Sequence, residues 1–394
     1  MELPQAVMTK PSRSNLQFIA KRQAVKGYTM PSKYGINIEF SNASPTSYDI
    51  DNSNPIAIIG DDTKLTGLSV YNSVSEALEA VGEGSIKNAL QDLEATSLKT
   101  QVVLSAFSKT PDNPQDNINK AIEAITKLKM SEAELSIKPR MLLCPEYNDS
   151  GVWEKLKQIS EYLRAIYAME LNSHTESEIK KELETIQTHR AIISYQKVQR
   201  IDKVVRPASV FLIALYAKIM ASSDYGFAQT YSNRVIDGII GVVDTIEYLQ
   251  GEDCEADRLR GEGVTCIIVD NGIRAWGRHT RDTALGLDSL HSIVIFDRII
   301  DTIFEAQKEA IDKQVADMVK QVQDDLDSFY RKLVANKVVV GYTISLPTEL
   351  NTNESIAQGE IYIQQNVQEM PIVSKIANKI YRVTDYSQEL IKEM

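Results

Sequence analysis

Short apolar runs alternate with segments of helical periodicity in the first part of the chain, and this alternation limits the possible folds most. Residues 56–60 and 101–107 are apolar runs of strand length. Residues 73–80 and 85–98 instead repeat their apolar positions at helical spacing, and Ser85 stands where it could cap the second of these helices. The alternation predicts an α/β layer structure in which helices cover a sheet.

The same pattern continues to about residue 270. The further elements expected there are a helix over residues 117–128, a strand over 140–145, an amphipathic helix over 152–168, an exposed helix within 172–190, an apolar helix over 210–221 and a strand over 264–269. Thr175 and Glu178 have the spacing of a capping box at the start of the exposed helix.

The pattern changes after residue 292. Residues 294–329 form one long helical stretch, with Asp312 at the point where a break could fall. Strands are expected over residues 338–344 and 360–364. We place a domain boundary near residue 275, so the 394-residue chain is expected to contain two domains of α/β (α+β) class.

Composition excludes several functions. A net charge of −11 argues against a nucleic-acid groove as the main activity. Three cysteines, an odd number without metal-ligand spacing, indicate reduced thiols in a protein made in the cytosol. No apolar run reaches the roughly 18 residues of a membrane span, so membrane insertion is not expected.

Residues that could carry chemistry form no recognisable site. No two histidines have the i, i+4 spacing of a helical zinc site, and no stretch matches a phosphate-binding loop. The acidic clusters lack the glycine and final glutamate of an EF-hand. We therefore predict no catalytic residue, no cofactor, no metal and no enzyme. An α/β enzyme whose groups meet only in the fold is kept as an alternative, and a monomeric interaction module as another.

Trp276 is a candidate interface residue because three arginines surround it: Arg274, Arg278 and Arg281. Tryptophan and arginine are over-represented at interface anchors, and these arginines could pair with carboxylates of another copy. An ordinary aromatic residue at a domain boundary explains the same pattern equally well.

Both ends of the chain carry apolar residues in extended segments. Those near the N-terminus are Tyr34, Ile36, Ile38 and Phe40, and those near the C-terminus are Ile380, Tyr381, Val383 and Tyr386. An isolated strand must pair its backbone groups with something. The partner is either a strand of the same subunit or the sheet of a neighbouring copy.

The most specific motifs lie between Arg206 and Thr280. They are Pro207 before an apolar helix, then Ser232-Asn233, then Ile236-Asp237-Gly238, and finally Trp276-Gly277-Arg278-His279-Thr280. This order resembles the middle of the contractile tail sheath proteins of bacteriophages, a family found also in R-type bacteriocins and related injection systems. The resemblance extends with gaps over most of residues 34–390. Glu146 stands where the family usually has a glycine after Pro145, so the turn there could differ.

The resemblance implies a mechanical function. Such proteins form six-subunit rings, stacked as a helix around an inner tail tube, and contract to drive the tube through a cell envelope. Implied partners are further copies of the chain, the tube protein, and baseplate and terminator proteins, with no direct nucleic acid contact. The implied location is the virion, after assembly in the host cytoplasm. A bacteriocin-like or other injection system is the alternative setting.

The resemblance also assigns the domains. It implies a leader over residues 1–33, an N-terminal arm and strand over 34–56, an outer α/β domain over 57–275, a tube-facing sheath domain over 276–378 and a C-terminal arm over 379–394. The arms are expected to exchange strands between subunits.

Overall fold

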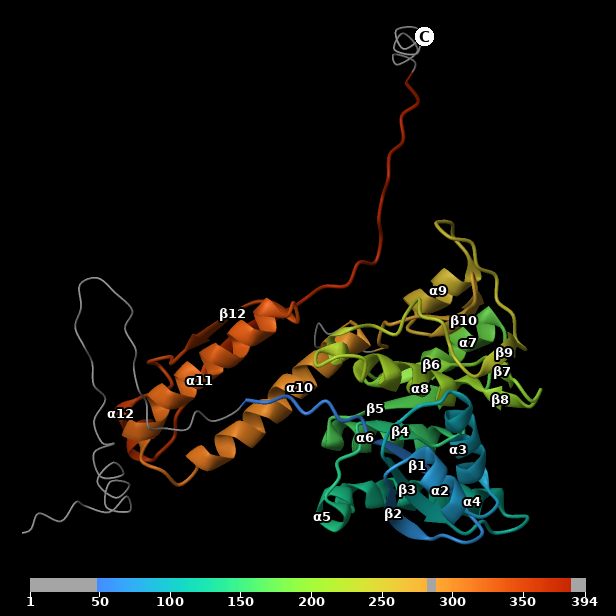
Figure 1. Ribbon diagram of the computed structural model, residues 1–394, viewed down its shortest axis with the longest axis horizontal. Coiled ribbons are helices and arrows are strands. Elements are labelled where there is room, and N and C mark those ends of the chain that lie inside the picture. The colour runs from blue at the N-terminus through green and yellow to red at the C-terminus, as the bar shows by residue number, and fades with distance from the viewer. Residues whose placement is uncertain (1–47, 282–287, 384–394) are drawn as a thin grey trace, which may run out of the picture.

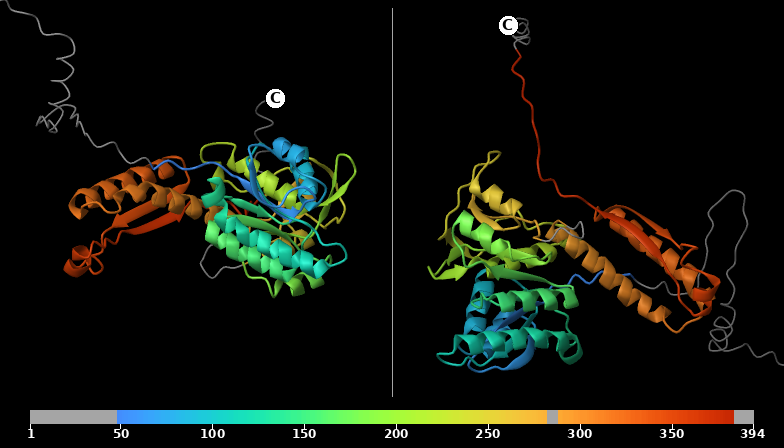
Figure 2. Two further views of the ribbon diagram at one scale, coloured as in Figure 1. Left: turned by 90° about the horizontal axis from the view of Figure 1, so that it is seen from below. Right: turned by 180° about the vertical axis from the view of Figure 1, so that it is seen from behind.

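The computed structural model describes residues 48–281 and 288–383. Figure 1 shows two parts. The α/β part, residues 55–276, holds the main sheet, and the hairpin part, residues 308–370, holds one long helix packed on two strands. Helix α10 (Leu290–Gln307) joins them. The hairpin part stands beside the α/β part in both views of Figure 2.

The main sheet has six strands in the order β2-β3-β1-β4-β5-β6. The strands are β1 (Ile56–Asp61), β2 (Gly67–Tyr71), β3 (Val102–Phe107), β4 (Met141–Leu143), β5 (Ile166–Glu170) and β6 (Ala191–Ser194). All neighbours pair in parallel except β2, which runs antiparallel to β3 at one edge. The parallel strands are apolar runs because both faces of this sheet are covered.

Two hydrophobic cores cover the two faces. One lies under α2 (Val74–Ala80), α3 (Ser85–Ala95) and α8 (Ala208–Met220), and the other under α4 (Pro114–Lys127), α6 (Ser150–Leu163), α7 (Glu176–Leu183) and α9 (Glu255–Gly261). Alternate residues of β1 enter different cores, Ile58 the first and Ile59 the second. Helix α8 is apolar on every side because it is buried almost all round.

Smaller elements complete the α/β part. The three-stranded sheet β8-β7-β9 is formed by β7 (Lys197–Arg200), β8 (Val205–Pro207) and β9 (Ile239–Val242). A hairpin is formed by β10 (Cys266–Val269) and β11 (Ile273–Trp276). The others are the short helix α5 (Ser131–Leu135) and the 3₁₀ turns η1 (Leu128–Met130) and η2 (Gly226–Ala228).

The buried carboxylate of Asp92 on α3 holds the three-stranded sheet in place. It accepts hydrogen bonds from Arg200 at 3.0 Å and Arg206 at 2.7 Å.

The hairpin part begins with η3 (Lys308–Ala310) and α11 (Val315–Ala335). It continues with β12 (Val339–Ser345), α12 (Asn353–Ala357) and β13 (Gln364–Glu369). The break between α10 and α11 falls where the sequence suggests, because Asp312 has a φ of 64°, outside the helical range. Antiparallel β12 and β13 lie against α11.

The α/β (α+β) class is confirmed, and several boundaries are corrected. The helix expected over residues 152–168 ends at Leu163, and β5 begins at Ile166. Ser85 does not cap α3; its hydroxyl accepts the Asp61 amide hydrogen at 2.9 Å, and Gly84 is the cap residue. The strand expected over residues 360–364 begins only at Gln364. Strands β6 to β9 were not anticipated.

Other local expectations can be checked directly. Cys144, Cys254 and Cys266 are buried free thiols. The Thr175 hydroxyl donates to the Glu178 carboxylate at 2.7 Å and caps no backbone amide of α7, so the two residues pair with each other and the capping box does not form. Glu146 has a φ of 70°, which explains why a glycine suits that position. None of the described helices is long and apolar enough to cross a membrane.

Candidate subunit interface

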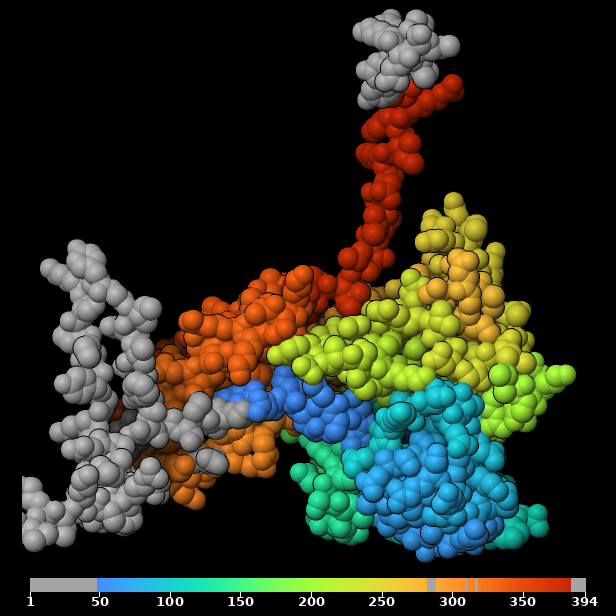
Figure 3. All heavy atoms as spheres, viewed as in Figure 1, coloured from blue at the N-terminus to red at the C-terminus, as the bar shows by residue number. Residues whose placement is uncertain are grey.

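The C-terminal tail, residues 371–383, carries apolar side chains that its own chain leaves in water. It follows β13 without regular secondary structure and extends away from the rest of the molecule (Figure 3). Ile376 is 75% exposed, Ile380 94% and Tyr381 76%. Exposed apolar residues along one segment mark an interaction surface in a soluble protein.

The start of the tail is fixed to the body. The Met370 amide donates to the Val338 carbonyl at 2.9 Å, which is one residue beyond β13. Arg278, itself buried, donates to the Ser374 hydroxyl at 2.5 Å. Burial, reinforced by the nearby Arg278 charge, lowers the pKa of His291 to about 4. His291 is therefore neutral at pH 7. The hydrogen bonds of Met370 and Ser374 fix the point at which the tail leaves the body.

The β12–β13 hairpin offers strand edges near this point. One face packs on α11, where Tyr342 stacks on Tyr330 with ring centroids 4.9 Å apart and donates to the Asp327 carboxylate at 2.6 Å. In the part of the chain that the structure describes, the hairpin has only these two strands, so each has an outer edge without a strand partner. A two-stranded sheet is marginally stable, and its free edges can accept another strand.

Residues 48–54, which we call the strap, run from a contact with the hairpin part to the start of β1. In Figure 1 this blue segment runs beside α10 and α11. At its start, Tyr48 is buried against Phe329 of α11, with ring centroids 5.5 Å apart. At its end, Arg298 of α10 donates to the Asp51 and Ser53 carbonyls at 2.8 and 3.0 Å and to the Asn54 side chain at 2.5 Å.

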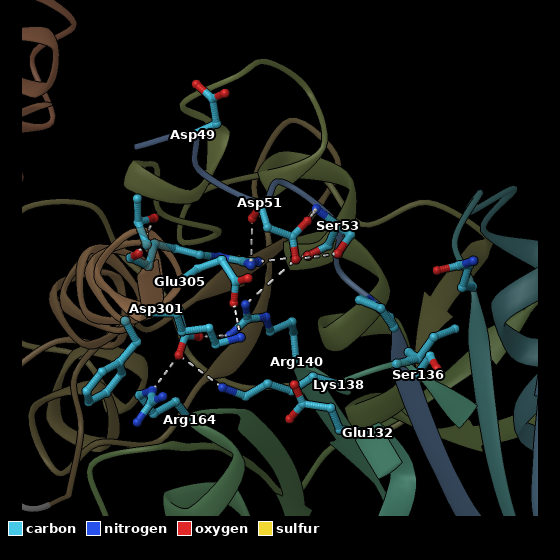
Figure 4. A pocket seen from close by; sticks show the side chains of 17 residues that line it. Asp49, Asp51, Ser53, Glu132, Ser136, Lys138, Arg140, Arg164, Asp301 and Glu305 are labelled. Carbon is cyan, nitrogen blue, oxygen red and sulfur yellow. Dashed lines mark hydrogen bonds and ion pairs between the residues drawn. The ribbon is translucent and has the colours of Figure 1, made fainter. Parts of the chain in front are cut away.

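Helix α10 is docked by charges across the amino ends of the parallel strands. Asp301 accepts from Lys138 at 3.0 Å, from Arg140, and from Arg164 at 2.6 Å. Figure 4 shows these three cations converging on the one carboxylate, two from the segment before β4 and one from the segment before β5. Burial alone would raise the pKa of Asp301, but Arg140 and Lys138 outweigh it and lower the pKa to about 2. One turn earlier, Asp297 pairs with Arg190 at 2.5 Å.

A cavity of about 630 Å³ lies beside this cluster, at the amino edge of the sheet. Ligands of open α/β sheets bind outside the opposite, carboxyl edge. Here that edge is occupied beside β1, because Asp61 accepts from Tyr147 at 2.8 Å and its backbone amide donates to Ser85. Tyr147 also packs edge-on against Phe107 with ring centroids 5.4 Å apart.

Other potentially reactive groups lie buried near the sheet. Burial raises the pKa of the Cys144 and Cys266 thiols, which disfavours the reactive thiolate. The described residues contain no group of three or more His, Cys, Asp or Glu side chains that could hold a metal ion.

Trp276 and the arginines beside it have partners in their own chain. The Trp276 indole donates to Asp257 at 2.7 Å, and the Arg260 guanidinium lies 4.1 Å from the ring centroid. Arg274 donates to the Asp270 and Asn233 carbonyls at 2.8 and 2.9 Å.

The remaining arginines are placed separately. Arg281 pairs with Glu262 at 2.8 Å, whereas Arg278 faces the start of the tail. The four side chains therefore do not form one cationic patch, because each makes a separate local contact.

Several candidate residues lie outside the described ranges: Tyr34, Ile36, Ile38, Phe40 and Tyr386. Sequence reasoning missed Tyr48, Arg298 and Asp301. The available signal was the set of charged residues Asp297, Arg298 and Asp301 within an otherwise apolar helical stretch, since buried charges require partners.

No family model matches the chain. The tail sheath protein of Escherichia phage P2 is 25% identical over 351 residues, covering 84% of this chain and 85% of the relative. The major tail sheath protein of Serratia phage KSP20 is 26% identical over 250 residues, covering 61% and 63%.

Two solved structures share the fold over nearly the whole chain. The contracted helical sheath of the anti-feeding prophage (AFP) superposes with a TM-score of 0.66 at 16% identity, covering 90% of this chain and all of that one. The contracted PVC sheath complex of an extracellular contractile injection system gives 0.64 at 13% identity, covering 91% and 99%.

Proposed function

We propose that this chain, a homologue of the contractile tail sheath proteins, is a sheath subunit that polymerises into a helical array and works by contraction. The observation that carries the proposal is the tail, an extended apolar segment fixed at its start and exposed along its length, next to a hairpin with open edges. In a polymer, an exposed apolar tail can add a strand to the open sheet edge of the next subunit at each contact; in a monomer both the tail and the edge stay without a partner.

The two ends of the chain act as the links. Residues 379–386, with Ile380, Tyr381, Val383 and Tyr386, add a strand to the sheet of a neighbouring copy. Tyr34, Ile36, Ile38 and Phe40 do the same at the other end. Backbone hydrogen bonds of an added strand hold tightly, while the chain between strand and body can change direction. Such links survive when subunits rotate against one another.

The rest of the assembly follows the sheath plan. Six-subunit rings stack around an inner tail tube, between a baseplate and a terminator. Residues 57–275 face outward, residues 276–378 face the tube, and Arg274, Trp276, Arg278 and Arg281 contribute to contacts between copies. The location is the phage tail, assembled in the host cytoplasm. A bacteriocin-like particle uses the same subunit in the same way.

Contraction requires no enzyme activity of the subunit. Two packings of the same subunits suffice if the contracted packing has the lower free energy, because that difference is stored when the extended form assembles. The filled carboxyl edge beside Asp61 and the buried thiols support this structural role over the α/β enzyme alternative.

Negative-stain microscopy of the purified protein tests the proposal. We expect striated hollow cylinders, whereas an enzyme or a monomeric module would give discrete particles. Deletion of residues 379–394 or 1–40 should leave folded subunits, by circular dichroism and thermal unfolding, that do not polymerise. Deletion of residues 1–33 is the matched control, because it keeps the proposed N-terminal strand and should still polymerise. Cylinders formed both by the variant lacking residues 379–394 and by the variant lacking residues 1–40 would contradict the strand-exchange proposal.

A further inference from the structure

We infer that Arg298 is the anchor through which tension on the N-terminal segment reaches the body of the subunit. The inference rests on the proposed function, in which that segment links one copy to the next. Force carried along the backbone from residues 1–47 to β1 passes through the strap, because the strap is the covalent connection between them.

The contacts of the strap show where the force would go. Arg298 is 3% exposed and binds three strap residues, through the main-chain carbonyls of Asp51 and Ser53 and the Asn54 side chain. These acceptors are neutral, so the geometry of the guanidinium, with several donors in a fixed plane, matters more than its charge. A lysine at this position keeps the charge but cannot place donors on all three acceptors at once.

The anchor is itself held rigidly. Arg298 lies on α10 between Asp297, which pairs with Arg190, and Asp301, which pairs with Lys138, Arg140 and Arg164. These cations precede β4, β5 and β6 along the chain. Tension on the strap would therefore be spread over the amino edge of the whole sheet. It would not act on the first hydrogen bonds of β1 alone.

The consequence is a defined length of the link. With the strap held, the first fixed point of the described chain is Tyr48, whose ring packs on Phe329. Losing both the Arg298 contacts and the Tyr48 contact would release residues 48–54 and add up to roughly 25 Å of reach, since an extended chain spans about 3.3–3.6 Å per residue. Arg298, together with the Tyr48 contact, thus sets how far two linked copies can move apart.

Distances between two spin labels on the full-length free chain test this directly. One label is attached at a cysteine replacing Asp49 in the strap and the other at a cysteine replacing Gln158 on α6; both positions are exposed, and the native cysteines are buried. We expect one narrow distance distribution with Arg298 in place. In Arg298→Lys we expect this distribution to broaden, by less than the roughly 20 Å that the six residues from Asp49 to Pro55 span when extended, because Tyr48 still packs on Phe329.

Two further variants keep the test decisive. Asn54→Ala removes one of the three acceptors and leaves Arg298, so it should broaden the distribution partially even if Arg298→Lys folds poorly. Arg331→Lys changes an exposed arginine on α11, bonded to Asp327 at 2.7 Å, and should leave the distribution narrow. A narrow peak retained in both Arg298→Lys and Asn54→Ala, or a broad distribution with Arg298 present, would overturn the inference.

The result is independent of polymerisation. If the unmodified chain forms no cylinders, the proposed sheath function fails, while the free-chain distances still decide whether Arg298 holds the strap. If cylinders form, those of Arg298→Lys should show a wider spread of ring-to-ring spacing by electron microscopy than those of Arg331→Lys. Equal spacing in the two would contradict the role of the anchor in the assembly.

Discussion

Gly277 shows what the Trp276–Arg278 motif does for the molecule. A Cβ atom at this position would lie 2.6 Å from the Thr265 Cα atom and 2.8 Å from the Val264 carbonyl oxygen. Its amide donates to the Ser232 hydroxyl at 3.2 Å, which ties together two of the motifs that the sequence singles out. The glycine is therefore needed because two backbones approach closely here, and this contact positions Arg278 under the tail.

Replacing Gly277 by alanine should destabilise the subunit by about 1–3 kcal/mol, because neighbouring backbone must move to admit the methyl group. Urea unfolding followed by circular dichroism measures the change. Gly261→Ala is the matched control, since nothing lies within 4 Å of a Cβ there and the residue ends α9. Alanine favours a helix by up to about 1 kcal/mol over glycine, so the control should be neutral or stabilising. Equal losses in both variants would show that the close approach has no energetic consequence.

At the scale of elements, the tail lacks a sheet to pair with and the hairpin lacks a third strand in the described chain. The tail has apolar side chains and no backbone partners, whereas β12 and β13 have outer edges without a strand beside them. Their own elements are nevertheless stable, because α11 covers one face of the hairpin through Tyr330 and Tyr342. Changes in the tail should therefore affect assembly while leaving the folded subunit intact.

Ile380→Asp tests that separation. Ile380 is 94% exposed, so the free energy of unfolding of the subunit should change by less than about 0.5 kcal/mol. Burying an isoleucine at a contact contributes about 2 kcal/mol, so the critical concentration for polymerisation should rise at least about 30-fold. Sedimentation of polymer against protein concentration measures it. Asn378→Asp adds the same charge at an already polar position and should have a smaller effect; identical shifts would indicate a purely electrostatic cause.

At the scale of the whole molecule, α10 decides how the two parts stand. The helix lies across the amino ends of the parallel strands and is held there mainly by Asp297 and Asp301. Burying a carboxylate is costly unless cations surround it, and Asp301 has three. The cluster fixes the hairpin part relative to the sheet, so the tail and the strap leave the subunit in defined directions.

Because of this cluster, the free energy of unfolding should depend on pH in the acidic range. The pKa of Asp301 is lowered from 3.8 to about 2, so its ionised form contributes about 2 kcal/mol above roughly pH 4. That contribution should decrease as the pH falls toward 2, because protonation then weakens the native pairs. Asp301→Asn should cost about 3 kcal/mol at pH 7, and its deficit should shrink below pH 4. Chemical denaturation at several pH values gives both quantities.

The matched control for this prediction is Asp237→Asn. Asp237 is an exposed carboxylate whose salt bridge is to Lys218, at 2.7 Å. Its replacement should cost no more than about 1 kcal/mol at pH 7. A deficit of Asp301→Asn that is equally small would show that the cluster does not hold α10.

The sequence by itself determined the α/β class, the long helical stretch with its break at Asp312, and the family resemblance. These depend on local periodicity, backbone preference and motif order, which can all be read from the order of the residues. It failed where local signals are ambiguous. Residues 166–168 continue the apolar spacing of α6 but belong to β5, because the left-handed Arg164 ends the helix and the sheet then supplies partners for the strand.

Only the tertiary structure decided which charges meet. Lys138, Arg140, Arg164 and Asp301 come from segments up to 163 residues apart, and no spacing rule connects them. The same holds for Arg298 and the strap, whose contacts are made to main-chain carbonyls and so leave little trace in side-chain patterns. Long-range partners are chosen by packing, since a buried charge is stable only where the fold brings a suitable acceptor or counter-charge within reach.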